Sequence, residues 1–110
     1  MSGQIRKNAA PLIEQWQETI SVEVERLFVR RIKTRWGSCN LQVRTIRLNT
    51  NLAKKPRARL EYIVVHEMIH ILEPTHNERF RAFMNQFMPD WKHRRQILNR
   101  LPVRHEDCGY

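Results

Sequence analysis

The strongest constraint on this fold is a segment, residues 57–72, that is apolar on almost every side. Its apolar side chains are Leu60, Tyr62, Ile63, Val64, Val65, Met68, Ile69, Ile71 and Leu72. A helix that is apolar all round has to be buried. Pro74 follows, and the residue before a proline is pushed out of the α region, so we expect the helix to end there. The sequence therefore predicts a domain assembled around one buried helix.

Within the most apolar part of this segment, residues 62–72, stand three polar side chains: His66, Glu67 and His70, in the pattern H-E-x-x-H. Helical residues four apart lie about 40° apart around the axis and one turn along it, so both imidazoles can converge on one ion. Glu67 is about 100° round the helix and can reach a water on that ion. Burying two imidazoles and a carboxylate is costly unless something satisfies them, and a metal does so directly. The pattern predicts one catalytic Zn²⁺ per chain, with Glu67 as general base.

A catalytic zinc site of this kind needs a third protein ligand. His76 follows His70 by six residues, past the proline break and at the expected first turn of the next helix. The chain reverses there, so the imidazole can fold back over the first two. Glu73 and Glu78 are competing ligands. We favour His76, because a neutral third nitrogen completes a common zinc set.

The chain before the buried helix contains the signals of one helix and two strands. Apolar residues at helical spacing predict a helix over 9–20, with Pro11 near its start. Residues 23–33 are β-prone and alternate with charges, which predicts a first strand. Residues 36–40, W-G-S-C-N, are expected to form a turn, and residues 42–49 a second strand antiparallel to the first.

Two further helices are expected after the buried one. Thr75 and Glu78 form a capping-box pattern for the first of them. The apolar residues on its face are Phe80, Phe83, Met84 and Phe87. A break at Pro89-Asp90 precedes the last helix, which begins at Trp91 and continues to Leu101. The predicted class is α+β, a small antiparallel sheet packed by three to four helices with the metal site on the buried helix.

Length and composition set the broad class of the protein. At 110 residues we expect a single domain over 1–110, long enough to bury a hydrophobic core without stabilising cross-links such as disulfide bonds. No apolar run approaches the ~18 residues of a membrane span, so we expect no membrane association. The N-terminus has no apolar stretch behind its charges, and Cys39 and Cys108 are too few for a disulfide framework. The expected location is the cytoplasm.

The segment 35–39, R-W-G-S-C, has a structural and a functional interpretation. A glycine after a tryptophan is most simply a turn glycine with the indole packed in the core. Alternatively, Arg35 or Trp36 contacts substrate. Cys39 has no zinc-ligand spacing and is expected to be a buried thiol outside the metal site, while His93 and His105 are expected at the surface.

Several of these residues also carry a resemblance to a known family. They are K-T-R-W-G-S-C at 33–39, Asn49, Leu52, Y-I-V-V-H-E-M-I-H at 62–70, His76, Phe80 and P-D-W at 89–91. Over about residues 27–101 the chain resembles the YgjP-like metallopeptidases, relatives of the SprT-like zinc proteases. The resemblance implies a zincin-like fold, zinc held by His66, His70 and His76, and Glu67 as catalytic base. Family members usually carry a longer β-rich N-terminal region, so we expect either a natural short form or a fragment.

The predicted function is that of a zinc-dependent metallopeptidase acting on peptides or proteins. As in zincins generally, we expect the strand at 42–49 to form a cleft wall and to pair with an extended peptide by β-augmentation. The net charge of +9 favours polyanions, so one alternative is a nucleic-acid-binding domain with a structural zinc. A hybrid is a protease acting on DNA-bound proteins, as SprT-like relatives do. Glu67 distinguishes these, because a structural zinc needs four closed ligands and no fourth is evident near the three histidines. The oligomeric state has no signature in the sequence.

Overall fold

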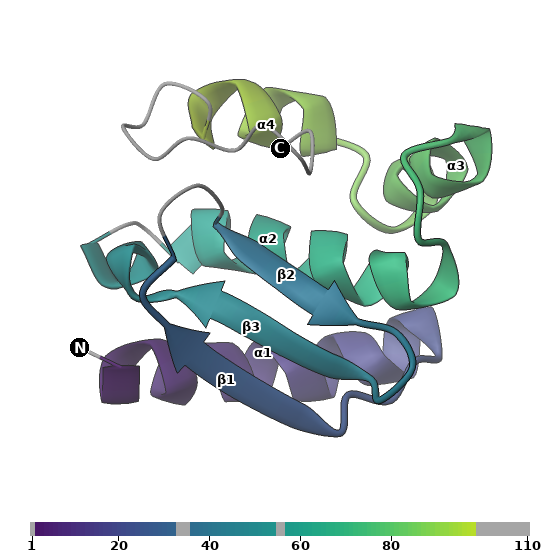
Figure 1. Cartoon of the computed structure of the whole chain (residues 1–110). Helices are drawn as coiled ribbons and strands as arrows, with labels where there is room; N and C mark the ends of the chain where they lie inside the picture. The colour runs from purple at the N-terminus through teal and green to yellow at the C-terminus, as the bar shows by residue number, and fades with distance from the viewer. Residues whose placement is uncertain (1, 33–35, 55–56, 99–110) are drawn as a thin grey trace.

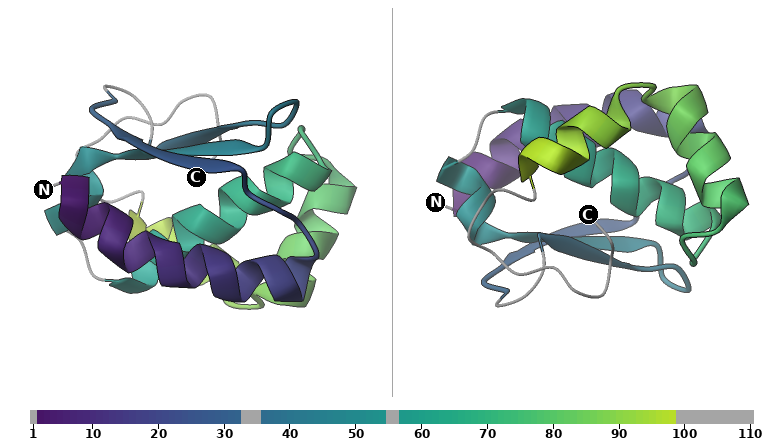
Figure 2. Two further views of the ribbon diagram at one scale, coloured as in Figure 1. Left: turned by 90° about the horizontal axis from the view of Figure 1, so that it is seen from below. Right: turned by 90° about the horizontal axis from the view of Figure 1, so that it is seen from above.

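The computed structural model describes residues 2–32, 36–54 and 57–98 of the chain. The elements in these ranges are α1 (Ser2–Ile20), β1 (Arg26–Arg30), β2 (Gly37–Asn40), β3 (Thr45–Asn49), the 3₁₀ helix η1 (Thr50–Lys54), α2 (Arg57–Leu72), α3 (Glu78–Phe87) and α4 (Trp91–Leu98). The strands form one layer, and α1 and α2 pack side by side against one of its faces (Figure 1, Figure 2). Helices α3 and α4 follow α2 on the side away from α1 (Figure 1). The predicted α+β class is confirmed. None of the described helices is long and apolar enough to cross a membrane.

The sheet is mixed, with strand order β1-β3-β2. β1 and β3 are parallel, in the register Leu27↔Ile46, whereas β2 and β3 form an antiparallel hairpin in the register Cys39↔Ile46. The expected antiparallel pairing of the first strand with residues 42–49 is therefore wrong. The reason is that residues 37–40, expected as a turn, form a strand of their own, so the chain reverses twice before β3 begins. The tight turn lies at residues 41–44 instead.

The N-terminal helix is longer than predicted, because it begins at Ser2 rather than near residue 9. Ile5 and Ala9 are buried and extend the apolar stripe of Leu12 back by two turns. Pro11 lies inside the helix on its exposed side, where its ring does not meet the core. Tertiary packing of the stripe thus outweighs the usual preference of proline for a helix start.

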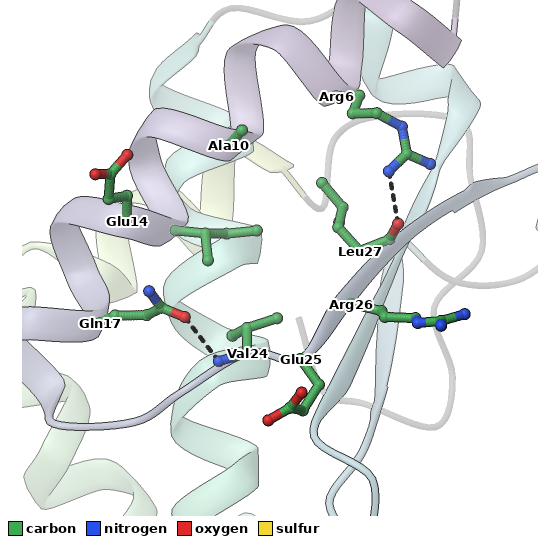
Figure 3. A pocket seen from close by; sticks show the side chains of 9 residues that line it. Arg6, Ala10, Glu14, Gln17, Val24, Glu25, Arg26 and Leu27 are labelled. Carbon is green, nitrogen blue, oxygen red and sulfur yellow. Dashed lines mark hydrogen bonds between the residues drawn. The ribbon is translucent and has the colours of Figure 1, made fainter.

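Side chains of α1 satisfy part of the chain that runs into β1. The Arg6 guanidinium Nη1 donates to the Leu27 carbonyl at 2.8 Å, and the Val24 amide donates to Gln17 Oε1 at 2.8 Å (Figure 3). These residues line a hollow of about 360 Å³ between α1 and β1. Because a carbonyl of β1 is already taken by Arg6, this side of the sheet is less suited to accept another strand.

Helix α2 has the predicted bounds and is the centre of the core. Every residue from Tyr62 to His70 is buried, among them the polar side chains His66 and Glu67. The Trp36 side chain is fully buried in the same core, as the structural interpretation of its segment expected. The sheet covers one face of α2, and α3 and α4 cover another, which leaves the polar side chains enclosed between layers.

Helix α3 is capped by a different residue from the one predicted. The Asn77 side chain accepts a hydrogen bond from the Phe80 amide at 3.0 Å, so Asn77 is the N-cap. The expected capping box with Thr75 is wrong, because the Thr75 hydroxyl donates to Glu73 Oε1 at 3.3 Å instead. The predicted apolar face is confirmed, with Phe80 and Met84 buried and the other two phenylalanines packed against the core. α4 begins at Trp91 as expected, and Leu101 lies outside the described residues.

Candidate metal centre

Three histidines bring their ring nitrogens together at the C-terminal end of α2. The Nε2 atoms of His66 and His70 are 3.1 Å apart, those of His70 and His76 are 2.9 Å apart, and those of His66 and His76 are 3.3 Å apart. The first two lie one turn apart on the helix, as the H-E-x-x-H spacing requires. The third comes from the segment between α2 and α3, just before the N-cap of α3. In the described part of the chain, these are the residues that bring ligand atoms together as a metal site would.

The Phe80 ring holds the three imidazoles from the α3 side. Its centroid is 4.5 Å from that of His70, with the planes nearly parallel, and 5.0 Å from those of His66 and His76. Phe80 is buried and its amide closes the α3 cap, so its position is fixed by the same turn that brings His76 back to α2. One aromatic side chain therefore packs against all three candidate ligands.

The hydrogen bonding of His70 prepares its Nε2 to donate a lone pair. His70 Nδ1 lies 3.1 Å from the Glu73 carbonyl oxygen, and only a protonated Nδ1 can donate to that acceptor. The neutral ring then carries its lone pair on Nε2, which faces the other two histidines. A carbonyl that orients a ring in this way is the usual support of a histidine ligand.

The spacing of the three nitrogens fits a tetrahedral zinc ion. Zinc–nitrogen bonds of about 2.05 Å at tetrahedral angles separate the nitrogens by about 3.3 Å, close to the 2.9–3.3 Å observed. Three imidazole nitrogens in mutual contact cannot all be satisfied by hydrogen bonds to one another, since each carries a single in-plane donor or acceptor. A cation between three lone pairs satisfies them all, so the donor set fits a metal.

Burial keeps at least two of these imidazoles neutral. It lowers the pKa of His70 to about 4, from an ordinary value of 6.5. Burial also lowers the pKa of His76, and the guanidinium groups of Arg95 and Arg81 lower it further. A neutral imidazole is the form that binds a metal, so both rings are ready to act as ligands at neutral pH.

Glu67 lies beside the histidines between α2 and β2. It is 1% exposed, and a methyl group at Gly37 would lie 3.5 Å from its Cγ. One turn before His66, the buried hydroxyl of Tyr62 has no hydrogen-bond partner among the described residues. Burial raises the pKa of this phenol, and Glu67 raises it further, whereas Arg95 opposes the rise. The phenol is therefore a neutral, buried group whose ring centroid lies 5.8 Å from that of His66.

The histidine cluster opens on a cavity of about 210 Å³. The residues that line it are His66, His76, Phe80, Arg81, Trp91 and Arg95. They come from α2, the turn after it, α3 and α4, so the cavity lies where these elements meet (Figure 1). A substrate group in this cavity would be next to two of the three candidate ligands.

Comparison with known proteins assigns the family. The model of the YgjP-like metallopeptidase domain family matches residues 1–101. The chain belongs to this family. Membership implies a metal, which agrees with the fit of the three histidines. No curated protein sequence matches the chain significantly.

Two solved structures share the fold of this YgjP-like domain. The metallopeptidase zymogen of Pyrococcus abyssi abylysin has a TM-score of 0.76 at 19% sequence identity, over 87% of this chain and 97% of that one. The metallopeptidase zymogen of Methanocaldococcus jannaschii jannalysin has a TM-score of 0.71 at 19% identity, over 84% of this chain and 96% of the other. At this identity the likeness extends to the fold, which confirms the expected metallopeptidase architecture.

Among the described residues, no other candidate named from the sequence contributes a ligand atom to the cluster. The Glu73 carboxylate accepts hydrogen bonds from Thr75 and Asn77 and lies 3.9 Å from the Arg79 guanidinium. Among the described residues, neither it nor Glu78 joins the metal-binding group. The remaining candidates are His93, exposed on α4, Cys39, half-buried on β2, and His105 and Arg35, which lie outside the described residues.

The strand expected to receive substrate is the wrong one. β3 occupies most of residues 42–49 and is the central strand, paired on both edges, so it cannot pair with a peptide. Among the described strands, the free edge on the side of α4 belongs to β2 (Figure 1). Sequence analysis missed this role, although a glycine inside a strand signals the close approach that Gly37 makes to Ile63 and Glu67.

Proposed function

We propose that this chain is a zinc-dependent peptidase in which His66, His70 and His76 hold one zinc ion and Glu67 is the general base. The observation that carries the proposal is the convergence of three imidazole nitrogens within 3.3 Å of one another, directly beside a buried carboxylate. The family supports a peptidase, and a set of three neutral nitrogens is typical of catalytic zinc sites that keep a position open.

Glu67 accepts a proton from the attacking water in this proposal. A zinc ion at the site supplies Lewis-acid chemistry, which polarises a peptide carbonyl and makes water more acidic. The carboxylate follows His66 in the sequence and is buried with it, so it can accept this proton and return it to the leaving amine. His70 is oriented by the Glu73 carbonyl, and Phe80 keeps all three rings in place.

The free edge of β2 is the proposed site for the peptide backbone. β2 packs against α2, and its first residue, Gly37, lies near Glu67. A peptide paired with this edge would run beside β2, on the side of the sheet where α4 lies, in place of the expected pairing with the central strand. Backbone hydrogen bonds provide affinity in such pairing, and side-chain pockets provide specificity.

The test of the catalytic proposal compares Glu67→Gln with Glu78→Gln. Glutamine keeps the size of Glu67 but cannot accept the proton, so the zinc-loaded variant should retain its metal and lose about 10²–10⁴-fold in kcat/KM on a fluorescent casein substrate. Glu78 is exposed on α3 and outside the cluster, so the same substitution there should leave both quantities unchanged. Full activity of Glu67→Gln would end the hydrolase assignment.

A second candidate function, action on protein bound to nucleic acid, is favoured by the outer face of the sheet. The face away from α1 and α2 presents exposed Arg26, Arg30 and Arg47. The Arg30 guanidinium lies 5.7 Å from the centre of the Phe28 ring. Arginines interleaved with an aromatic ring suit phosphate contacts and base stacking. This face lies away from the histidine cluster, so binding there would leave the cavity accessible.

A further inference from the structure

The side chains that line the cavity at the histidine cluster together carry positive charge, in addition to the charge of any bound metal. Two of its six lining side chains are arginines, Arg81 on α3 and Arg95 on α4, and no carboxylate is among the described residues that line it. Both guanidinium groups act on the pKa of His76, and Arg95 also acts on that of Tyr62, which places the two charges close to the candidate metal site. The cavity thus combines an apolar wall, from Phe80 and Trp91, with two cations.

These two arginines differ from their neighbours on the same helices. Arg79, also on α3, faces the Glu73 carboxylate at 3.9 Å. Arg94, next to Arg95 on α4, pairs with Asp90 at 3.0 Å and with Glu61 at 3.3 Å. In the part of the chain that the structure describes, no acidic partner within ion-pair distance is found for Arg81 or Arg95. Each helix therefore has one arginine paired with a carboxylate and one exposed arginine that lines the cavity.

We propose that Arg81 and Arg95 form a carboxylate-binding subsite that makes the enzyme prefer peptides with an acidic group next to the scissile bond. This proposal rests on the proposed peptidase function. Arginine suits the role because its planar guanidinium donates two hydrogen bonds to one carboxylate. The cavity contains His66 and His76, so a carboxylate bound there lies within about two residues of the bond that is cleaved, given the ~3.3 Å rise of an extended peptide.

The carboxylate can come from an Asp or Glu side chain or from the free C-terminus of the peptide. Both have the same charge and geometry, but they predict different substrates. An acidic side chain selects internal sites, whereas a terminal carboxylate selects the end of the chain. Peptides with a central Glu and an amidated C-terminus, compared with peptides that lack acidic residues but have a free C-terminus, distinguish the two sources.

The experiment measures kcat/KM of the zinc-loaded enzyme for sets of three matched peptides, each set carrying Glu, Gln or Lys at one position around the scissile bond. The wild type should prefer Glu over Gln by about tenfold at one position, the size expected for a charge-assisted contact at a partly exposed site. Arg81→Gln and Arg95→Gln should each reduce this ratio, and Arg81→Glu combined with Arg95→Glu should reverse it in favour of Lys. Arg79→Gln is the matched control and should keep the wild-type ratio.

Binding to the inert Glu67→Gln variant provides a readout that does not depend on catalysis. Fluorescence anisotropy of labelled Glu and Gln peptides should give a lower Kd for Glu, and this difference should disappear in Glu67→Gln combined with Arg81→Gln and Arg95→Gln. If the wild type shows no preference for Glu over Gln and none for a free over an amidated C-terminus, the subsite is refuted while the peptidase function stands. If it cleaves nothing but still binds Glu peptides through the two arginines, the peptidase function fails and the carboxylate site stands.

Discussion

The contact between β2 and the metal helix predicts a large effect for one methyl group. In Gly37→Ala, the new Cβ would lie 3.0 Å from Ile63 Cγ2, 3.1 Å from the Arg47 carbonyl oxygen and 3.5 Å from Glu67 Cγ. Ile63 is fully buried, and Arg47 belongs to the central strand, which is paired on both sides. Neither neighbour can retreat freely, so one of the two layers has to shift.

The expected cost follows from two opposing terms. Overpacking a buried contact costs about 1–3 kcal/mol of unfolding free energy, and the lower entropy of the unfolded chain with alanine offsets about 0.4–1 kcal/mol of this. The net loss should be about 1–2 kcal/mol. For a domain of this size, that corresponds to a decrease of the melting temperature by about 5–15 °C.

Urea unfolding of the metal-free protein, followed by circular dichroism, measures this loss. Gly3→Ala is the matched control, because a methyl group there meets nothing within 4 Å and residue 3 lies in a helix, where alanine is favoured. That variant should be as stable as the wild type or slightly more stable. A Gly37→Ala protein with undiminished stability would refute the close packing of β2 on α2.

Two further predictions concern pH and salt. Because the pKa of His70 is lowered to about 4 in the folded protein and is 6.5 ordinarily, the unfolded state takes up this proton first as pH falls. The metal-free protein should therefore lose up to about 2 kcal/mol of unfolding free energy between pH 7 and pH 5, and urea unfolding independent of pH in this window would contradict the burial of His70. If the outer sheet face binds nucleic acid, affinity for single-stranded DNA should fall with salt with a log–log slope of about −0.7 per neutralised phosphate, and Arg47→Gln should make the slope shallower. Binding that does not depend on salt, or none at low salt, would leave this face an ordinary solvated surface.

The metal helix was predictable because its signals are local and strong. The apolar run fixes burial, Pro74 fixes the end, and the i, i+4 spacing of His66 and His70 places both rings on one side. The role of His76 as third ligand could be inferred from zinc coordination, because a site of two histidines needs a third ligand and the chain must turn at the proline. The proximity of His66 and His70 follows from these features alone, whereas the place of His76 beside them, rather than of Glu73 or Glu78, is given by the structure.

The sheet was not predictable in the same way, because strand order and direction depend on distant packing. Gly37 looks like a turn residue, yet its missing side chain allows a strand to approach α2 closely. Once residues 37–40 form a strand, two chain reversals make β3 run parallel to β1, but no local signal indicates that β3 rather than β2 is the central strand. Arg81 and Arg95 carry no motif, and their common cavity exists only because α3 and α4 fold back over α2.

The zinc affinity of single histidine variants tests the proposed metal centre most directly. Dissociation constants are measured by competition with a chromophoric chelator, together with the metal content of the dialysed proteins. We expect one zinc per chain in the wild type and in His93→Ala, whose imidazole is exposed on α4. His66→Ala, His70→Ala and His76→Ala should each weaken binding by at least ~100-fold, because each removes one of three donors. Wild-type affinity in His76→Ala, or no zinc binding by the wild type, would contradict the proposed centre.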